Sequence, residues 1–100
     1  MPITSSVSGD GNTVTISITG RFDFNDHSSF RDAYRDRPPS ANYLLDLSAT
    51  DYMDSSALGM LLLLREHAGG ESAKISIGGS KPEIKKILTI ANFQKLFEIR

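Results

Sequence analysis

Three adjacent residues, Asp54, Ser55 and Ser56, are the best placed in this sequence to do chemistry. They follow the apolar segment around Leu45 and precede the apolar segment that begins near Leu58, which predicts a buried strand leading into a helix. The first backbone N–H groups of a helix have no partner within it and carry the positive end of its dipole. This position therefore suits an anion.

Two interpretations of these residues stay open. In one, Asp54 or Ser55 is simply the N-cap of the helix. One cap needs only one residue, however, so a second serine is left over, partly exposed and accessible to an external kinase. A phosphoserine at that place would carry a charge of about −1.5 to −2.

Other candidates for chemistry are weaker. His27 and His67 are the only histidines and there is no cysteine, so we expect no metal site and no other cofactor, and we assign both histidines to surface or capping roles. A serine hydrolase built on Ser56 would have to recruit one of these remote histidines, and no G-x-S-x-G motif is present. We expect no catalysis by this chain.

A glycine-rich segment, Gly78-Gly79-Ser80-Lys81, faintly resembles a phosphate-binding loop but lacks the G-x-x-x-x-G-K-[ST] spacing. Ser80 and Glu83 instead have the S-x-x-E spacing of a capping box, which predicts the start of a helix. That interpretation accounts for the serine without a ligand.

The strands that would position these residues are predicted from apolar alternation and turn residues. A strand at 3–8 and a strand at 13–19 flank the turn residues 9–12 and form a hairpin. The segment 43–47 is nearly continuously apolar, which is typical of a parallel strand covered on both faces. Shorter strands are expected around 75–77 and 96–99.

Three helices are predicted from apolar residues at helical spacing. The first is capped by Asn25 or Asp26 and ends before Pro38-Pro39, with apolar positions at Phe30, Ala33 and Tyr34. The second runs from about Ser55 to Ala68 and is closed by Gly69-Gly70; the spacing puts on one face Leu58, Leu61, Leu62 and Arg65. The third carries an apolar stripe at Ile84, Ile87, Leu88 and Ala91.

The order of these elements predicts an α/β fold. Strand–helix–strand repeats in the C-terminal half require right-handed crossovers and parallel strands, while the initial hairpin adds an antiparallel edge. The length of 100 residues is that of one domain with one core.

Composition narrows the partners. The net charge of −1 gives no excess positive field, so we expect no direct binding to nucleic acid and a protein partner instead. The apolar run 60–64 is far shorter than the roughly 20 residues of a membrane span, and residues 1–6 do not resemble a signal peptide. Together with the lack of cysteine, these features lead us to expect a cytoplasmic protein without membrane insertion.

The run from Asp46 to Gly59, D-L-S-x-x-x-x-M-D-S-S-A-L-G, resembles the signature of STAS domains of the anti-sigma factor antagonist type. The segment 20–23, G-R-F-D, is similar to that family's G-x-hydrophobic-D turn, and the segment 96–99 also agrees. The resemblance covers the whole chain and implies a single STAS domain over residues 1–100. The implied fold is a mixed, mostly parallel sheet of about five strands with an N-terminal antiparallel hairpin and three to four flanking helices.

The resemblance also implies a function and its residues. In this family the second serine of the pair, here Ser56, is phosphorylated by a partner that is both an anti-sigma factor and a serine kinase of the histidine-kinase-like ATPase fold. A metal-dependent Ser/Thr phosphatase reverses the modification, and the unphosphorylated form binds the kinase so that its client is released. The implied docking surface consists of Asp23, Asp54, Ser55, Ser56, Ala57, Leu58 and Gly59; capping remains the alternative role of the two aspartates.

Ala57 departs from the commonest family pattern, in which glycine is frequent at this place. Alanine favours the helix by about 1 kcal/mol over glycine and leaves Ser56 intact, but the departure leaves the branch of the family open. A rival function is a constitutive STAS accessory subunit of a lipid or anion transporter ATPase, and phosphorylation of Ser56 in cells would distinguish the two.

Overall fold

The computed structural model describes residues 3–100, so Met1 and Pro2, with which the predicted domain begins, lie outside the described residues. The strands, in chain order, are β1 (Ile3–Val7), β2 (Thr13–Ile18), β3 (Gly20–Phe22), β4 (Asn42–Asp46), β5 (Thr50–Met53), β6 (Ile75–Gly78) and β7 (Glu98–Ile99). The α-helices are α1 (His27–Tyr34), α2 (Ser55–His67) and α3 (Pro82–Ile90), and short 3-10 helices are η1 (Phe24–Asp26), η2 (Gly70–Ser72) and η3 (Phe93–Lys95).

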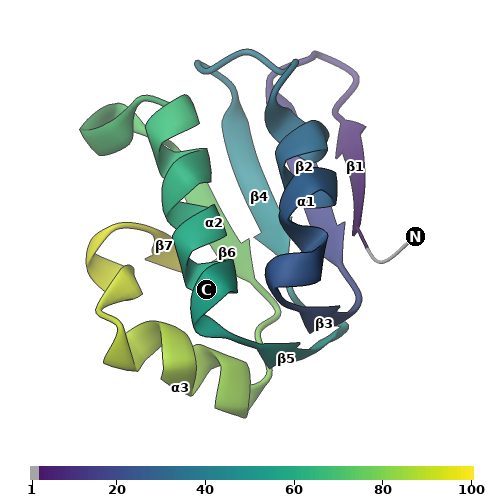
Figure 1. Ribbon diagram of the computed structural model, residues 1–100. Coiled ribbons are helices and arrows are strands. Elements are labelled where there is room, and N and C mark those ends of the chain that lie inside the picture. Colours follow the sequence, from purple (N-terminus) through teal and green to yellow (C-terminus); the bar gives the residue numbers. More distant parts are fainter. Residues whose placement is uncertain (1–2) are drawn as a thin grey trace.

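Five of the strands form one mixed sheet in the order β1-β2-β4-β6-β7 (Figure 1). The hairpin pair β1–β2 is antiparallel, and each of the other neighbouring pairs is parallel. This confirms the predicted fold: an α/β domain with a mostly parallel sheet and an antiparallel N-terminal edge.

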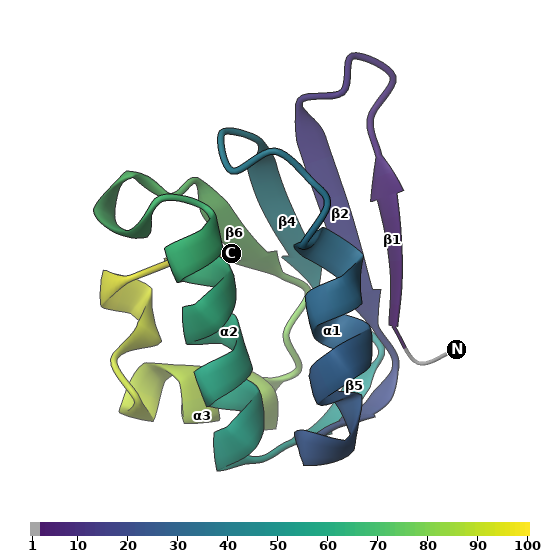
Figure 2. The same cartoon turned by 45° about the horizontal axis from the view of Figure 1, so that its top comes forward.

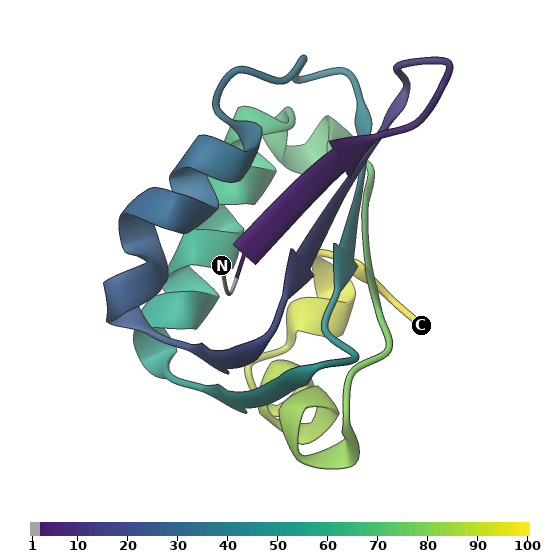
Figure 3. The same ribbon diagram turned by 90° about the vertical axis from the view of Figure 1, so that its right-hand side faces the viewer.

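The sheet is covered by α1 and α2 on one face only. The two helices lie side by side against it (Figure 2), and Figure 3 shows the opposite face without a helix layer. Tyr43 and Leu45 of β4 face the helices and are 1% and 0% exposed, whereas Leu44, which faces the other way, is only half-buried. The prediction that this strand is covered on both faces is therefore wrong.

The reason lies in the neighbours of Leu44. Its partners in the sheet are Thr15 of β2 and Ser76 of β6, whose hydroxyls are compatible with water. Because Leu44 is a leucine on a face that carries hydroxyl residues in the neighbouring strands, the β4 segment looks continuously apolar in the sequence. The alternation of side chains in the adjacent strands is that of a sheet with one face exposed to solvent.

The helix α2 buries a different stripe from the face that its sequence spacing suggested. Ala57, Met60, Leu61 and Leu64 pack into the core, and Leu61 is the one residue shared with the predicted face. Its end is as predicted, since Gly69 and Gly70 follow with φ of 110° and 63°, in the left-handed region that favours glycine.

The start of α3 differs from the expected capping box. Lys81 occupies the N-cap position without a side-chain bond to the helix, and Pro82 is the first helical residue. The ring of a proline at that position fixes φ at a helical value. The backbone N–H that proline lacks would have no partner within the helix at this position. The helix thus begins one residue later than the Ser80–Glu83 pattern requires, and within residues 3–100 the buried Ser80 hydroxyl has no hydrogen-bond partner.

Candidate functional site

The predicted site residues directly follow the two strands of a small second sheet, which was not predicted from the sequence. The strands β3 and β5 pair in parallel, with Phe22 opposite Met53, and Figure 1 shows them at the end of the molecule where α1 and α2 begin. The Asp54 backbone N–H donates to the Phe22 carbonyl at 3.4 Å. Asp23 directly follows β3 and Asp54 directly follows β5, so this pairing places the two aspartates side by side.

One hydrogen bond joins the small sheet to the end of β2, and a second joins β3 to the residue before β5. The hydroxyl of Thr50, which is fully buried, donates to the Ile18 carbonyl at 2.7 Å, and the Gly20 N–H donates to the Ala49 carbonyl at 2.8 Å. Because β5 leads directly into α2, the start of α2 is anchored to the end of β2.

Both aspartates act as caps. Asp54 is extended (φ −106°, ψ −179°), and its Oδ1 accepts from the Ala57 N–H at 2.9 Å, which is the N-cap bond of α2. Asp23 caps η1 by accepting from the Asn25 N–H at 3.0 Å, while Asp26 Oδ2 accepts from the Asp23 N–H at 3.1 Å. Of the two predicted cap candidates at α2, the structure has Asp54 and not Ser55.

The two serines are the first two residues of α2, where backbone N–H groups have no partner inside the helix. Ser55 is exposed and Ser56 is half-buried, so exposure alone does not select Ser56 over Ser55. Ala57 behind them is fully buried, and Leu58 is half-buried against the core.

Beyond the serines, the outer face of α2 exposes a glycine and two leucines. Gly59 is exposed, and a Cβ built on it would meet nothing within 4 Å. Leu62 and Leu63, one turn further, are 40% and 53% exposed, and Phe24 in η1 is 67% exposed. Residues 55, 59, 62 and 63 share one side of the helix by i, i+3 and i+4 spacing. We call Ser55, Ser56, Gly59, Leu62 and Leu63 the α2 face.

A positive group borders the aspartates. The Arg21 guanidinium lies 4.1 Å above the ring of Tyr52 and its Nε is 3.4 Å from Asp23 Oδ2. The arginine is thus stacked on β5 and paired at the same time, and its side chain remains 67% exposed.

The other candidate residues have structural roles elsewhere. His67 Nε2 lies 3.0 Å from the Arg37 carbonyl, and its ring packs between Tyr34 and Tyr43. His27 stacks loosely on Phe24, with 6.1 Å between ring centres. In residues 3–100 no three histidine, cysteine or carboxylate side chains gather as metal ligands would.

The glycine-rich loop before α3 is shaped by packing. Gly79 has a φ of 75°, and a Cβ there would lie 2.9 Å from Ser48 Cβ. Lys81 donates to Asp51 of β5, which ties the start of α3 to the small sheet. Close approach of two loops explains the glycine without a phosphate.

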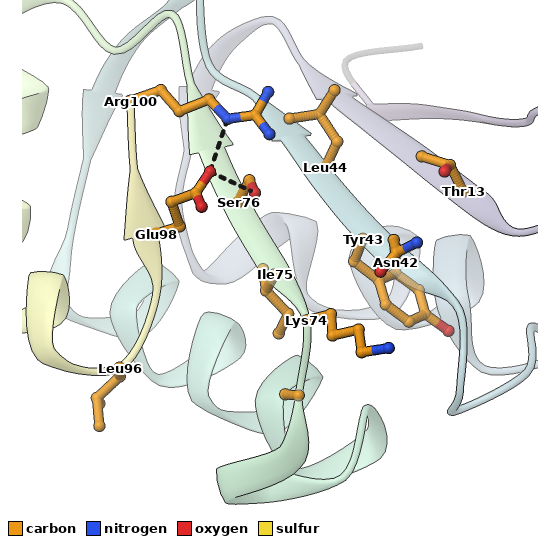
Figure 4. A pocket seen from close by; sticks show the side chains of 11 residues that line it. Thr13, Asn42, Tyr43, Leu44, Lys74, Ile75, Ser76, Leu96, Glu98 and Arg100 are labelled. Carbon is orange, nitrogen blue, oxygen red and sulfur yellow. Dashed lines mark hydrogen bonds and ion pairs between the residues drawn. The ribbon is translucent and has the colours of Figure 1, made fainter.

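A hollow of about 580 Å³ lies at the outer face of the main sheet. Figure 4 shows Lys74, Ser76, Glu98 and Arg100 around it, and none of the predicted site residues lines it. Glu98 accepts from both Ser76 and Arg100, and these two hydrogen bonds, the one to Arg100 first, hold the pKa of the Glu98 carboxyl below its ordinary value. The α2 face, which is exposed at Ser55, Gly59, Leu62 and Leu63, lies apart from this hollow.

Comparisons with known proteins agree with this architecture. Residues 5–98 match the family described as Mlab, STAS domain. A STAS-domain containing protein of Pseudomonas aeruginosa (strain UCBPP-PA14) is 56% identical over 100 residues, which cover 99% of each chain.

Solved structures share the fold at low sequence identity. A putative anti-sigma factor antagonist from Thermotoga maritima superposes with a TM-score of 0.81 at 14% identity, covering 97% of this chain and 84% of that one. The Bacillus cell fate determinant SpoIIAA, solved in its phosphorylated form, gives a TM-score of 0.66 at 13% identity, covering 98% and 90%.

The fold is the one that solved anti-sigma factor antagonists share. This chain belongs to the STAS-domain family.

The sequence pattern indicated the serines and the aspartates as candidates but gave no indication of several residues around them. Phe24, Leu62 and Leu63 carried no separate signal, because exposed leucines in a helix look like core residues until the helix is oriented. Arg21 was named only as part of the G-R-F-D turn, and its stacking on Tyr52 depends on a strand pair that the sequence did not predict.

None of the helices described in residues 3–100 has the length and hydrophobicity that crossing a membrane requires.

Proposed function

We propose that this protein is a phosphorylation-controlled binding module: its unphosphorylated form docks a protein partner through the α2 face, and phosphorylation of Ser56 ends that contact. The observation that carries the proposal is that α2 is capped by Asp54 and not by either serine. Asp54 already supplies the cap through its bond to the Ala57 N–H, so neither serine is needed to begin the helix. The serine pair is free for another role.

The physics of the site favours a switch that leaves the fold unchanged. A negative charge in the first turn of a helix is favoured by about 0.3–1 kcal/mol, while the neighbouring carboxylates of Asp23 and Asp54 oppose it. These effects largely offset in the free protein. The same charge pressed against a desolvated or like-charged partner surface costs several kcal/mol, and each 1.4 kcal/mol is about tenfold in affinity.

The surface around the serines fits a protein partner. Leu62, Leu63 and Phe24 are large apolar side chains exposed to solvent, and exposed apolar side chains are typical of an interaction site when they lie together. The exposed Gly59 costs helix stability that no internal contact of the chain recovers. A partner that approaches the helix backbone closely would require a residue without a side chain at this position.

The proposed partners follow from the family resemblance. They are a serine kinase of the histidine-kinase-like ATPase fold that also acts as an anti-sigma factor, and a metal-dependent Ser/Thr phosphatase that restores the unphosphorylated form. The SpoIIAA structure, solved in its phosphorylated form, supports a phosphate on a domain of this fold. The choice of Ser56 over the more exposed Ser55 rests on the resemblance and needs its own test.

The first experiment maps the modification. Incubated with its kinase and ATP, the protein should gain one phosphate, at Ser56. Tryptic digestion and mass spectrometry locate it, with the Ser56→Ala and Ser55→Ala variants as a matched pair. A phosphate found only on Ser55 or elsewhere would remove Ser56 from the proposal.

The second experiment tests the switch. A pull-down with Ser56→Ala should recover the kinase-type partner, and titration calorimetry should then show Ser56→Asp binding at least about tenfold more weakly than Ser56→Ala. Ser55→Asp is the control, because it adds the same charge one residue away. If Ser56→Asp and Ser56→Ala bind alike, Ser56 is not the switch, and recovery of a transporter ATPase would instead favour a constitutive accessory subunit.

A further inference from the structure

The outer edge of the main sheet is formed by β1, and no strand of residues 3–100 pairs with its outer side. The strand order leaves β1 with β2 as its one neighbour. Figure 3 shows β1 in the foreground with no helix or strand in front of it. A free edge presents unpaired backbone N–H and C=O groups, which are a template for another strand.

The backbone groups of alternate residues point to this edge. Ser8 N–H donates to the Thr13 carbonyl at 2.9 Å, and in an antiparallel pair the bonded and non-bonded positions alternate. The even-numbered residues of β1 therefore bond to β2, and the odd-numbered residues turn their backbone groups outward; these are Ile3, Ser5 and Val7. Within residues 3–100, no backbone group from outside the sheet bonds to Ser5 or Val7.

The edge lacks the features that usually protect one. The segment 3–7, Ile-Thr-Ser-Ser-Val, contains no charged residue and no proline, and its register with β2 is unbroken by a bulge. Val7 is 39% exposed. Natural edge strands are commonly blunted by lysine, proline or bulges, so an unprotected edge is available for pairing.

We propose that β1 pairs with the β1 strand of a second copy of this chain, antiparallel and centred on Ser5. The occupant is inferred from the order of side chains, which reads apolar, hydroxyl, hydroxyl, hydroxyl, apolar in both directions. A two-fold contact requires this self-complementarity, because each residue must suit its symmetry mate. Ser5 then lies opposite Ser5 of the second copy, and Ile3 lies opposite Val7.

This register uses every outward-facing backbone group. The pairs Ser5–Ser5 and Ile3–Val7 are hydrogen-bonded pairs, giving about six backbone bonds across the two-fold axis. On the wet face of the sheet, Thr4 of each copy lies opposite Ser6 of the other. The two sheets become one continuous sheet.

Neighbouring charges do not oppose this contact. The helix α1 packs beside β1. Its charged residues Arg31 and Asp32 balance, and so do Arg35 and Asp36, which follow its end. Arg35 pairs with both aspartates, at 3.4 Å and 3.9 Å. A contact built on one short strand is small, so the dimer is a weak one, with a Kd between about 10 µM and 1 mM.

The test is sedimentation velocity of the full chain from about 10 µM to 1 mM, the range that brackets such a Kd. We expect a reversible monomer–dimer equilibrium. Ser6→Lys places like charges diagonally across the axis and should raise the Kd at least about tenfold. The control is Ser72→Lys, the same substitution at an exposed position in η2, which should leave the Kd unchanged.

The register is tested by a charge pair. In the double variant Thr4→Glu/Ser6→Lys, each new carboxylate faces a new ammonium of the second copy, so dimerisation should return to at least the wild-type level. Thr4 and Ser6 are both exposed, and circular dichroism of each variant checks that the fold is retained. A monomer at every concentration, or a dimer that Ser6→Lys leaves unchanged, overturns the proposal. Failure of the double variant to restore the dimer overturns the register.

This inference stands apart from the phosphoswitch. Ser56→Asp should dimerise like wild type, because the serine lies at the start of α2 and not on β1. A change of the dimer Kd on Ser56→Asp would overturn the independence of the two surfaces.

Discussion

Gly59 offers the sharpest test of the α2 face, because its effects on stability and on binding should have opposite signs. It is the fifth residue of α2, it is exposed, and a Cβ there would meet nothing within 4 Å. Glycine inside a helix is about 1 kcal/mol less favourable than alanine, partly because it gives the unfolded chain more freedom. Gly59→Ala should therefore stabilise the protein by about 0.5–1 kcal/mol.

The corresponding change in melting temperature can be measured directly. For a domain of this size, 1 kcal/mol shifts Tm by about 4–8 °C, so Gly59→Ala should raise Tm by about 2–8 °C. Scanning calorimetry and urea denaturation would report the gain. Gly9→Ala is the matched control: its Cβ also meets nothing within 4 Å, but Gly9 lies in the β1–β2 turn and gains nothing from helix propensity.

Binding should respond in the other direction. If the partner packs closely on the α2 face, an added methyl group overfills the contact and costs about 1–3 kcal/mol, which is about 5- to 150-fold in affinity. Titration calorimetry against the partner recovered with Ser56→Ala measures this, and Gly9→Ala should bind like wild type. A variant that is stabilised but binds normally would refute the docking of a partner over Gly59. A variant that is not stabilised would refute the account of its helical environment.

Three further predictions concern the frame of the site. Asp54→Ala should lose about 0.5–2 kcal/mol of stability in urea denaturation, while Asp54→Asn should keep most of it, because asparagine caps as well as aspartate; equal losses would argue against capping. Thr50→Val leaves the buried Ile18 carbonyl without its donor and should cost about 1–3 kcal/mol, more than Thr50→Ser, and the reverse order in thermal unfolding would contradict this role. Hydrogen bonds from Ser48, first its hydroxyl and then its N–H, hold the pKa of Asp46 below its ordinary value, so this carboxylate stabilises the fold above the ordinary aspartate pKa and ceases to do so as pH falls through the lower folded-state pKa. The stability difference between wild type and Asp46→Asn should accordingly shrink on acidification in urea titrations, and a difference independent of pH would exclude the mechanism.

The sequence predicted the large elements well because periodicity and caps are local signals. The helix expected from Ser55 to Ala68 runs from Ser55 to His67, and Gly69 follows in the left-handed conformation that the pattern required. The antiparallel hairpin and the parallel strands after it also agree with the order of the apolar segments.

The small sheet could not be predicted in the same way. The strands β3 and β5 are three and four residues long, and neither has room for a clear alternation. Their pairing joins Phe22 to Met53, and no local pattern records a contact over that separation. Asp23 and Asp54 were found as separate motifs, and the resemblance rather than the spacing indicated that they share a surface.

The orientation of α2 was the other feature that local spacing left open. An apolar run such as Met60 to Leu64 contains several possible stripes, and the buried one is the stripe that includes Ala57. As a consequence Leu62 and Leu63 point outward. Tertiary packing, not amphipathicity, decided which leucines became available to a partner.

The close approach of Gly79 to Ser48 has a consequence for how this sequence can drift. A side chain at Gly79 would be strained by the left-handed backbone, and its Cβ would lie 2.9 Å from Ser48 Cβ in the neighbouring loop. Substitutions there should therefore reduce the amount of folded protein, whatever the function of the protein. Selection for abundance alone would keep this glycine. The same selection would remove Gly59, whose replacement costs the fold nothing, so a library of variants sorted once for abundance and once for partner capture should separate the two glycines.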